Sequence, residues 1–207
     1  TRWQRKPDTW RSLGEALRIT AETYRRALWS TADSYVEVWL EKDALAGVLY
    51  EETGTFDVPL MVTRGYPSLT FLHSAAAAIA RQERPVFLYY FGDWDPSGKD
   101  ISRAVERDLR AFAPKAEIHF ERVAVNPEQI ESMNLPTRPT KKTDSRSKKF
   151  RGESVEVDAI PPLTLRTMAR KRIVSHLDVR ELERLEVAEE AERETLRRFA
   201  ESFGEAA

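Results

Sequence analysis

The chain has no cysteine and only three histidines among its 207 residues. Disulfide bonds, thiolate metal sites and a cysteine nucleophile are therefore excluded. No run of about 18 apolar residues occurs, so no segment is expected to span a membrane. The first residues, TRWQRKPDTW, lack the apolar stretch of a signal peptide. We therefore expect a cytoplasmic protein, associated with the nucleoid if the cell is bacterial or archaeal.

The chain also lacks a large net charge of either sign, because its 33 basic and 34 acidic residues leave a net charge of -1. The charge is nevertheless unevenly distributed. Residues 134–151 read NLPTRPTKKTDSRSKKFR, with seven Lys or Arg against one Asp. Such a segment attracts the phosphates of a nucleic acid, and a solvated surface loop is the alternative interpretation. The apolar content of 41% is typical of a globular protein.

Apolar periodicity predicts alternating strands and helices. The expected strands are 35–41, 58–62, 86–91, 116–125 and 154–158. The expected helices are 9–32, 42–52, 68–82, 97–112, a short one near 126–127, 163–176 and 178–203. This order predicts an α/β fold with a mostly parallel sheet, helices on both faces and helical extensions at both ends.

Three regions follow from this pattern. Residues 1–33 form a helical lead-in, which we interpret as the end of an upstream domain missing from this chain. Residues 34–177 form the main domain and include the basic loop 134–153. Residues 178–207 form a charged helix that packs on the domain or on a partner chain, and its thin apolar stripe does not decide between them.

Three carboxylates are expected at one edge of the sheet. Glu41 ends the first strand, and Asp93 and Asp95 follow the third strand in the sequence YYFGDWDPSGKDI. The carboxyl ends of parallel strands share an edge, and residues i and i+2 of an extended segment point the same way. Without histidine or cysteine nearby, this oxygen set suits magnesium or manganese.

Each of these acids also has an ordinary structural interpretation. Asp95 could cap the helix that begins at Pro96, although Ser97 and Asp100 also have the spacing of a capping box. Asp93 could be a turn residue, and Glu41 could form a surface ion pair with Lys42. Their expected location on one edge favours the metal site.

Three motifs resemble the Toprim domain, in the form found in the topoisomerase VI A subunit and its meiotic double-strand-break relatives. They are VEVWLEKDALAGVL with Glu41, VPLMVTRGYPSLTFL with Gly65, and VFLYYFGDWDPSGKDISRAV with Asp93, Asp95, Pro96 and Gly98. The resemblance covers residues 35–112, more than a third of the chain. It implies a Toprim-like (Rossmann-like) fold.

The resemblance also implies a function, namely magnesium-dependent DNA strand breakage by transesterification or hydrolysis. Glu41, Asp93 and Asp95 would be both catalytic and metal-binding, and Mn²⁺ could replace Mg²⁺. In this family an attacking tyrosine lies on a winged-helix-like domain before the Toprim strands. Only 34 residues precede Tyr35 here, so we expect the nucleophile on a missing N-terminal domain or in a bound water. A homodimer is the other partner that we expect.

The second half of the chain adds further candidates. Glu156 and Asp158, within SVEVDAIPP, could supply a second set of metal ligands, with an exposed strand residue as the alternative for Glu156. Basic residues and one glycine are candidates for binding phosphate. They are Lys42, Arg64, Gly65, Lys99, Arg138, Lys141, Lys142, Arg146, Lys148, Lys149 and Arg151.

Two other functions compete with strand breakage. A non-cleaving module would bind metal and nucleic acid while a partner supplies the chemistry. An aspartyl phosphatase of the haloacid dehalogenase type also uses Asp-x-Asp, but after its first strand, and it would leave Glu41 without a role. His73, His119 and His176 lack ligand spacing, so we expect them to be core or surface residues.

Overall fold

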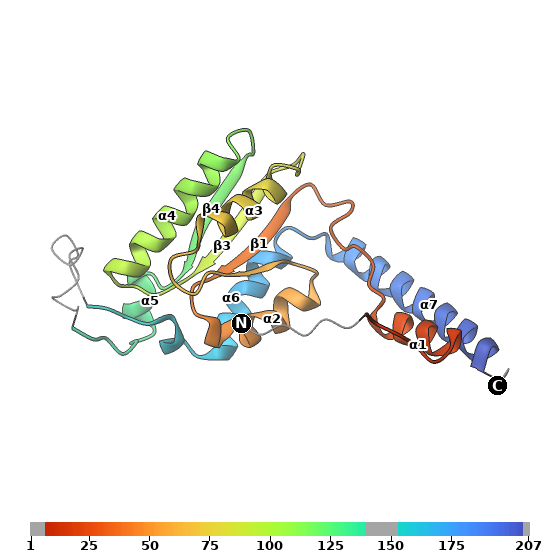
Figure 1. Cartoon of the computed structure of the whole chain (residues 1–207). Helices are drawn as coiled ribbons and strands as arrows, with labels where there is room; N and C mark the ends of the chain where they lie inside the picture. Colours follow the sequence, from red (N-terminus) through yellow and green to blue (C-terminus); the bar gives the residue numbers. More distant parts are fainter. Residues whose placement is uncertain (1–6, 140–152, 205–207) are drawn as a thin grey trace. The chain divides into compact units, whose positions relative to one another are not determined.

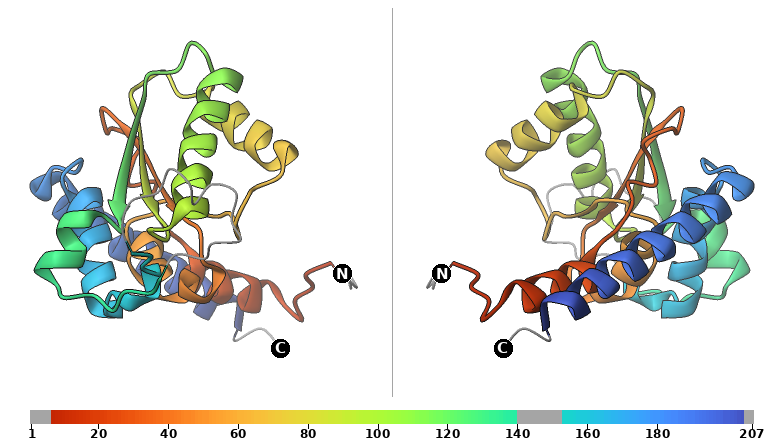
Figure 2. Two further views of the ribbon diagram at one scale, coloured as in Figure 1. Left: turned by 90° about the vertical axis from the view of Figure 1, so that its left-hand side faces the viewer. Right: turned by 90° about the vertical axis from the view of Figure 1, so that its right-hand side faces the viewer.

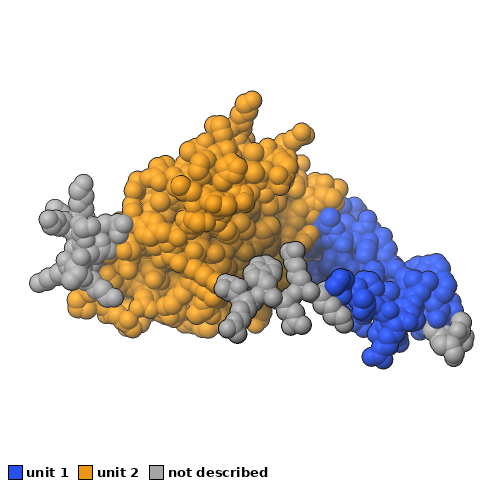
Figure 3. Space-filling view, viewed as in Figure 1, with its two compact units in different colours: residues 1–28, 178–207 blue, residues 29–177 orange. Residues whose placement is uncertain are grey.

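The computed structural model describes residues 7–139 and 153–204. The chain forms two compact units (Figure 3). One consists of residues 29–177, and the other combines residues 1–28 with residues 178–207. No helix in the described ranges is both long and apolar enough to cross a membrane.

The larger unit is built on a four-stranded sheet (Figure 1). Its strands are β1 (Tyr35–Leu40), β2 (Leu60–Val62), β3 (Val86–Phe91) and β4 (Ile118–Ala124). They follow the order β2-β1-β3-β4, and every neighbouring pair is parallel. The predicted α/β class and parallel sheet are confirmed. The central strands β1 and β3 are continuous apolar runs because both of their faces are covered.

Helices cover both faces of the sheet (Figure 2). The helices of this unit are α2 (Ala46–Thr55), α3 (Leu69–Ile79), α4 (Pro96–Phe112), α5 (Pro127–Ser132) and α6 (Pro162–Val174). Short 3₁₀ turns, η1 (Asp43–Leu45) and η3 (Val157–Ala159), precede α2 and α6. Helices α3 and α4 contact each other on one face, and α2 contacts α6 on the other.

The core lies between the sheet and the α3/α4 layer. Trp39 of β1 and Leu88 and Tyr90 of β3 pack there against Ile79 of α3 and Val105 of α4. All five side chains are fully buried. Because strand side chains alternate between faces, this packing fixes the register of the strands and therefore where each strand ends.

The smaller unit contains α1 (Leu13–Thr23) and α7 (Val179–Gly204), which contact each other. Tyr24 Oη donates to Glu192 Oε2 at 2.7 Å, and Arg193 Nη2 donates to the Tyr24 carbonyl at 2.7 Å. The first helix is shorter than the predicted 9–32, since the Ser12 side chain caps its start and the chain is extended at Tyr24. Tyr24 thus serves packing between these two helices.

The strand predicted at 154–158 is wrong. Only isolated antiparallel bridges form there, between Val155 and Trp94 and between Ser154 and Arg138, and a 3₁₀ turn follows. The Val157 amide donates to the Asp93 side chain, at 2.7 Å, and this bond takes the place of one to a neighbouring strand. The alternating pattern of SVEV therefore reflects burial of Val155 and Val157, not a sheet strand.

Candidate functional site

The ends of β1 and β3 bring the predicted acidic residues together. Leu40 pairs with Phe91, and the Glu41 amide donates to the Phe91 carbonyl at 2.9 Å. Glu41 is therefore level with Gly92, one residue before Asp93. The expectation that these strands are neighbours with a shared edge is confirmed.

The Glu41 carboxylate lies directly against the loop that carries the aspartates. Its Oε2 accepts from the Asp93 amide at 3.2 Å and from Tyr90 Oη at 3.3 Å. Gly92 makes this approach possible, because a Cβ there would overlap Glu41 Oε2 and would lie 2.5 Å from Tyr90 Cε1. Only glycine leaves room for the carboxylate at this position.

The two aspartates each accept a backbone amide. Asp93 Oδ1 accepts from Val157, and Asp95 Oδ1 accepts from Gly98, both at 2.7 Å. Asp95 is thus the N-cap of α4, as its structural interpretation proposed, and the alternative cap through Ser97 is wrong. Capping leaves Asp95 at the shared edge, so it does not remove the residue from the candidate site.

The electrostatics of this edge favour protons or cations. Burial, followed by the nearby charge of Asp93, raises the pKa of Glu41 to about 7. Burial also raises the pKa of Asp93 above its ordinary value, against the opposing effect of the Val157 amide. Carboxyl groups held this close resist simultaneous ionisation unless a positive charge joins them.

One positive charge at this edge was missed by the sequence analysis. The guanidinium of Arg122, on β4, donates to the main-chain carbonyls of Gly92, Asp93 and Gly98, each at 2.9 Å. Burial lowers the pKa of Arg122 from its ordinary value. An arginine inside the strand sequence IHFERVA, at the end of a parallel strand, was the only available signal.

Lys42 is held by the late acidic pair. Its Nζ lies 2.9 Å from Glu156 Oε2 and 2.5 Å from Asp158 Oδ2. Although burial opposes it, these hydrogen bonds, first from Asp158 and then from Glu156, raise the pKa of Lys42. Arg138 Nη1 also donates to Glu156, at 2.7 Å. The structure therefore brings the predicted second acidic pair to a lysine that directly follows Glu41.

A shallow pocket lies beside this lysine-bound pair. Its volume is ≈ 280 Å³, and it is lined by Pro136, Arg138, Glu156, Asp158 and Ala159. The pocket therefore has both positive and negative walls.

Of the other predicted phosphate-binding residues, Arg64 and Gly65 lie on the loop after β2, and Lys99 lies in the first turn of α4. Arg64 and Gly65 both have positive φ, 53° and 87°, and turn the chain after β2. Arg64 pairs with Asp43 at 3.1 Å. Lys99 Nζ lies 4.5 Å from the centroid of the Trp94 ring. Lys141, Lys142, Arg146, Lys148, Lys149 and Arg151 of the basic loop lie outside the described residues.

The carboxylates of the site are of the type that binds a divalent cation, but they are not arranged around a common point. Within residues 7–139 and 153–204, no three His, Cys, Asp or Glu side chains are arranged to hold a metal ion. Asp93 and Asp95 each direct one oxygen to an amide, and Glu41 directs one to the Asp93 amide. Carboxylate oxygens are the ligands that magnesium prefers, and joint coordination by these three residues would require a different arrangement of their side chains.

A scan against protein-family models finds no match, and neither does a search of curated proteins. A functional proposal therefore depends on the residues at the carboxyl ends of β1 and β3.

Proposed function

We propose that the chain carries out magnesium-dependent breakage of DNA strands, as a Toprim-type domain related to the topoisomerase VI A subunit. One observation carries the proposal: Glu41 Oε2 lies 3.2 Å from the Asp93 amide, where two adjacent parallel strands end. The turn at Gly65 and the Asp-x-Asp-Pro-x-Gly loop at 93–98 also follow the strands that the resemblance requires.

In this proposal Asp93 and Asp95 hold the metal, and Glu41 completes the site or transfers a proton. Bound magnesium would supply charge stabilisation for the phosphate in an in-line displacement. Glu41 suits proton transfer to the leaving 3′ oxygen, since its pKa of about 7 lets it exchange a proton at neutral pH. Gly92 and Tyr90 keep its carboxylate against the loop.

Positive residues around the edge would bind the DNA backbone. Lys42 follows Glu41 directly, Lys99 lies in the first turn of α4, and Arg138 lies beside the pocket. Contacts of this kind bind phosphate without reading bases, so they predict binding that weakens with salt and tolerates sequence changes.

The nucleophile is not assigned to a residue. Tyr24 donates to Glu192 at 2.7 Å, and Tyr66 donates to Asp100 at 2.6 Å. Neither tyrosine matches the attacking tyrosine of the family that the chain resembles. A water would give hydrolysis with a free end. A tyrosine from another domain or a second copy would give transesterification with the DNA end attached to protein.

A second candidate, a module that binds metal and nucleic acid without cutting, is favoured by one observation. In the described part of the chain the carboxylates bind amides and do not form a ready metal cluster. A partner would then supply the chemistry, and the edge would serve only for attachment.

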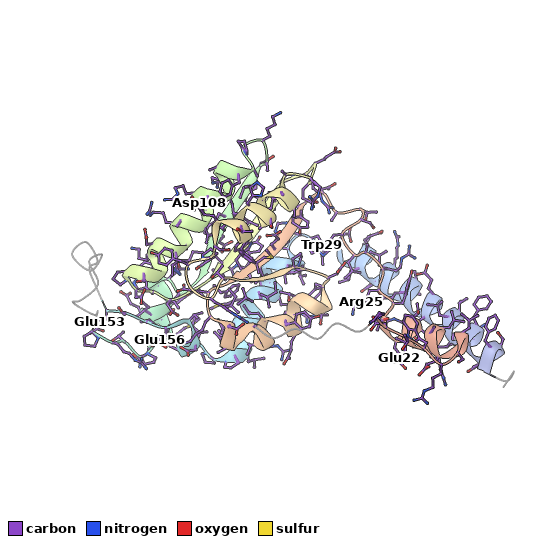
Figure 4. The ribbon with its side chains drawn as sticks, viewed as in Figure 1. Glu22, Arg25, Trp29, Asp108, Glu153 and Glu156 are labelled. Atoms are coloured by element: carbon purple, nitrogen blue, oxygen red, sulfur yellow. The ribbon has the colours of Figure 1, made fainter. Side chains whose placement is uncertain are left out.

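Cleavage of supercoiled plasmid and of a labelled duplex, with Mg²⁺ or Mn²⁺, tests the proposal. We expect Asp93→Asn to lower cleavage by about 10³-fold, since it removes the negative charge of a proposed metal ligand. Asp108→Asn, near the other end of α4, is the matched control and should leave the rate unchanged (Figure 4).

The outcomes separate the two candidates. Metal-dependent cutting that Asp93→Asn abolishes supports strand breakage, and protease-sensitive retention of the DNA end reveals a covalent intermediate. Salt-sensitive binding with no cutting, under either metal, would replace the enzyme by the binding module.

A further inference from the structure

The Arg122 guanidinium is the cation that β4 contributes to the edge, and no motif of the sequence analysis includes it. Its hydrogen bonds within the described residues go to four main-chain carbonyls. Nη1 donates to Gly92 at 2.9 Å and to Ala124 at 3.3 Å, and Nη2 donates to Asp93 and Gly98, both at 2.9 Å. The side chain is half-buried, 5.5 Å from the Tyr90 ring centroid.

These carbonyls bracket the aspartates. Gly92 and Asp93 begin the loop, and Gly98 belongs to the first turn of α4, so the tied positions enclose Asp95. The Asp93 and Gly98 amides then donate to Glu41 and Asp95. Arg122 therefore binds the carbonyl of the Gly92–Asp93 peptide unit, whose amide donates to Glu41. It also binds the carbonyl of Gly98, the residue whose amide donates to Asp95.

A guanidinium is suited to this task in a way that a lysine is not. Its planar group presents five donors in a fixed fork, whereas an ammonium is a compact charge on a flexible stem. Here two nitrogens serve four acceptors from three segments, the end of β4, the loop and the start of α4. The contacts thus fix the distance between the beginning and the end of the loop.

We propose that Arg122 is a positioning residue, which holds the 92–98 loop in the conformation whose amides orient the carboxylates of Glu41 and Asp95. This inference rests on the proposed function for its metal. It predicts that loss of the guanidinium loosens the loop first and weakens cation binding as a consequence.

Hydrogen exchange tests the positioning without any metal. In Arg122→Ala, the amides of Asp93 and Gly98 should exchange at least tenfold faster than in the wild type, while amides in the middle of β1 keep their rates. Arg172→Ala is the control, because Arg172 pairs with Glu121, the neighbour of Arg122, at 2.8 Å. Unchanged exchange at Asp93 and Gly98 in Arg122→Ala would overturn the inference.

Mn²⁺ affinity, measured by paramagnetic resonance of the free ion, tests the consequence. Arg122→Ala should bind Mn²⁺ about tenfold more weakly, the usual effect of losing a group that orients ligands. Millimolar guanidinium should restore much of this affinity by occupying the vacated site, whereas equal sodium should not. A loss of affinity that guanidinium leaves unchanged, with exchange unaffected, would contradict positioning.

The two proposals fail in different ways. If the wild type binds no Mn²⁺, the metal site of the proposed function is lost, but hydrogen exchange still decides whether Arg122 orders the loop. If Arg122→Ala does not fold, Arg122→Lys is measured instead, because lysine keeps the positive charge but lacks the planar guanidinium group. Arg122→Lys should then show the faster exchange, and wild-type exchange rates in it would overturn the inference.

Discussion

The strand β1 carries one acidic residue in its middle and is followed by another, and their surroundings differ. Glu37 is 1% exposed and accepts from Trp39 Nε1 at 2.8 Å and Tyr35 Oη at 3.1 Å, both from its own strand. Glu41 is half-buried and accepts from an amide of the loop after β3. Burial raises the pKa of both.

The difference lies in what each carboxyl faces. Residues 35, 37 and 39 point to the same face of the sheet, so Glu37 is satisfied by neutral donors two positions away. The second-largest cause of the raised pKa of Glu41 is the charge of Asp93. A raised pKa alone therefore does not identify a functional acid, and it is the second acid beside it at a strand end that makes Glu41 a candidate.

The same substitution at both positions gives the largest expected effect. Glu41→Gln should lower metal-dependent cleavage by about 10²–10⁴-fold, the range for loss of a proton-transfer group. Glu37→Gln should leave the cleavage rate within about twofold, because Glu37 is sealed inside the core. Initial rates on a labelled duplex measure both, and equal losses at the two positions would break the comparison.

Replacement of the cradle glycine should have the next largest effect. A Cβ in Gly92→Ala would overlap the Glu41 carboxylate, so we expect a loss of about 1–3 kcal/mol in the free energy of unfolding. The Mn²⁺ affinity should fall with it. Gly47→Ala is the control, since no atom lies within 4 Å of the Cβ and a helical alanine adds about 0.5–1 kcal/mol. Urea unfolding of both variants measures the contrast.

The proximity of Glu41 and Asp93 could be predicted from the sequence because it follows from local patterns and one topological rule. VFLYYF forms a strand over the predicted 86–91, and adjacent parallel strands end together. Capping by Asp95 was also available locally, as an aspartate before proline. These features depend on neighbours in the chain or on the handedness of crossovers.

The contacts that complete the site join residues far apart in the sequence. Arg122 reaches Gly92 across 30 positions, Val157 reaches Asp93 across 64, and Lys42 reaches Glu156 across 114. These contacts depend on how the whole sheet packs. Local sequence patterns therefore do not predict them. The alternation in SVEV likewise predicted a strand because periodicity reports burial and not the presence of a hydrogen-bonding neighbour.

The metal-free protein should lose stability as the pH rises. The pKa of Glu41 is raised from an ordinary 4.5 to about 7 in the folded state, so the native protein holds this proton more tightly. The stabilisation is complete below about 4.5 and is lost as the pH rises to about 7. We expect a decrease on the order of 1–2 kcal/mol, reduced from the full linkage value by the partial exposure of Glu41.

One variant and one metal condition test the source of that decrease. Glu41→Gln should reduce the pH dependence of the free energy of unfolding between pH 5 and 7, and the raised pKa values of Glu37 and Asp93 account for the slope that remains. Saturating Mn²⁺ should reverse the trend in the wild type, because the metal binds the ionised form. A wild-type profile that rises through this window without metal would contradict the assigned burial of Glu41.

The smallest effect is expected for substitution of Arg138. The Arg138 side chain is 75% exposed and pairs with Glu156 at 2.7 Å, so Arg138→Gln should change stability by less than about 1 kcal/mol. If Arg138 contacts a phosphate, the slope of log affinity against log salt should decrease by about one. Arg198→Gln is the matched control, because Arg198 is 73% exposed and pairs with Glu194 at 3.4 Å on α7. Fluorescence titrations at several salt concentrations measure the slopes, and equal decreases for both arginines would mean that DNA binding does not centre on the site.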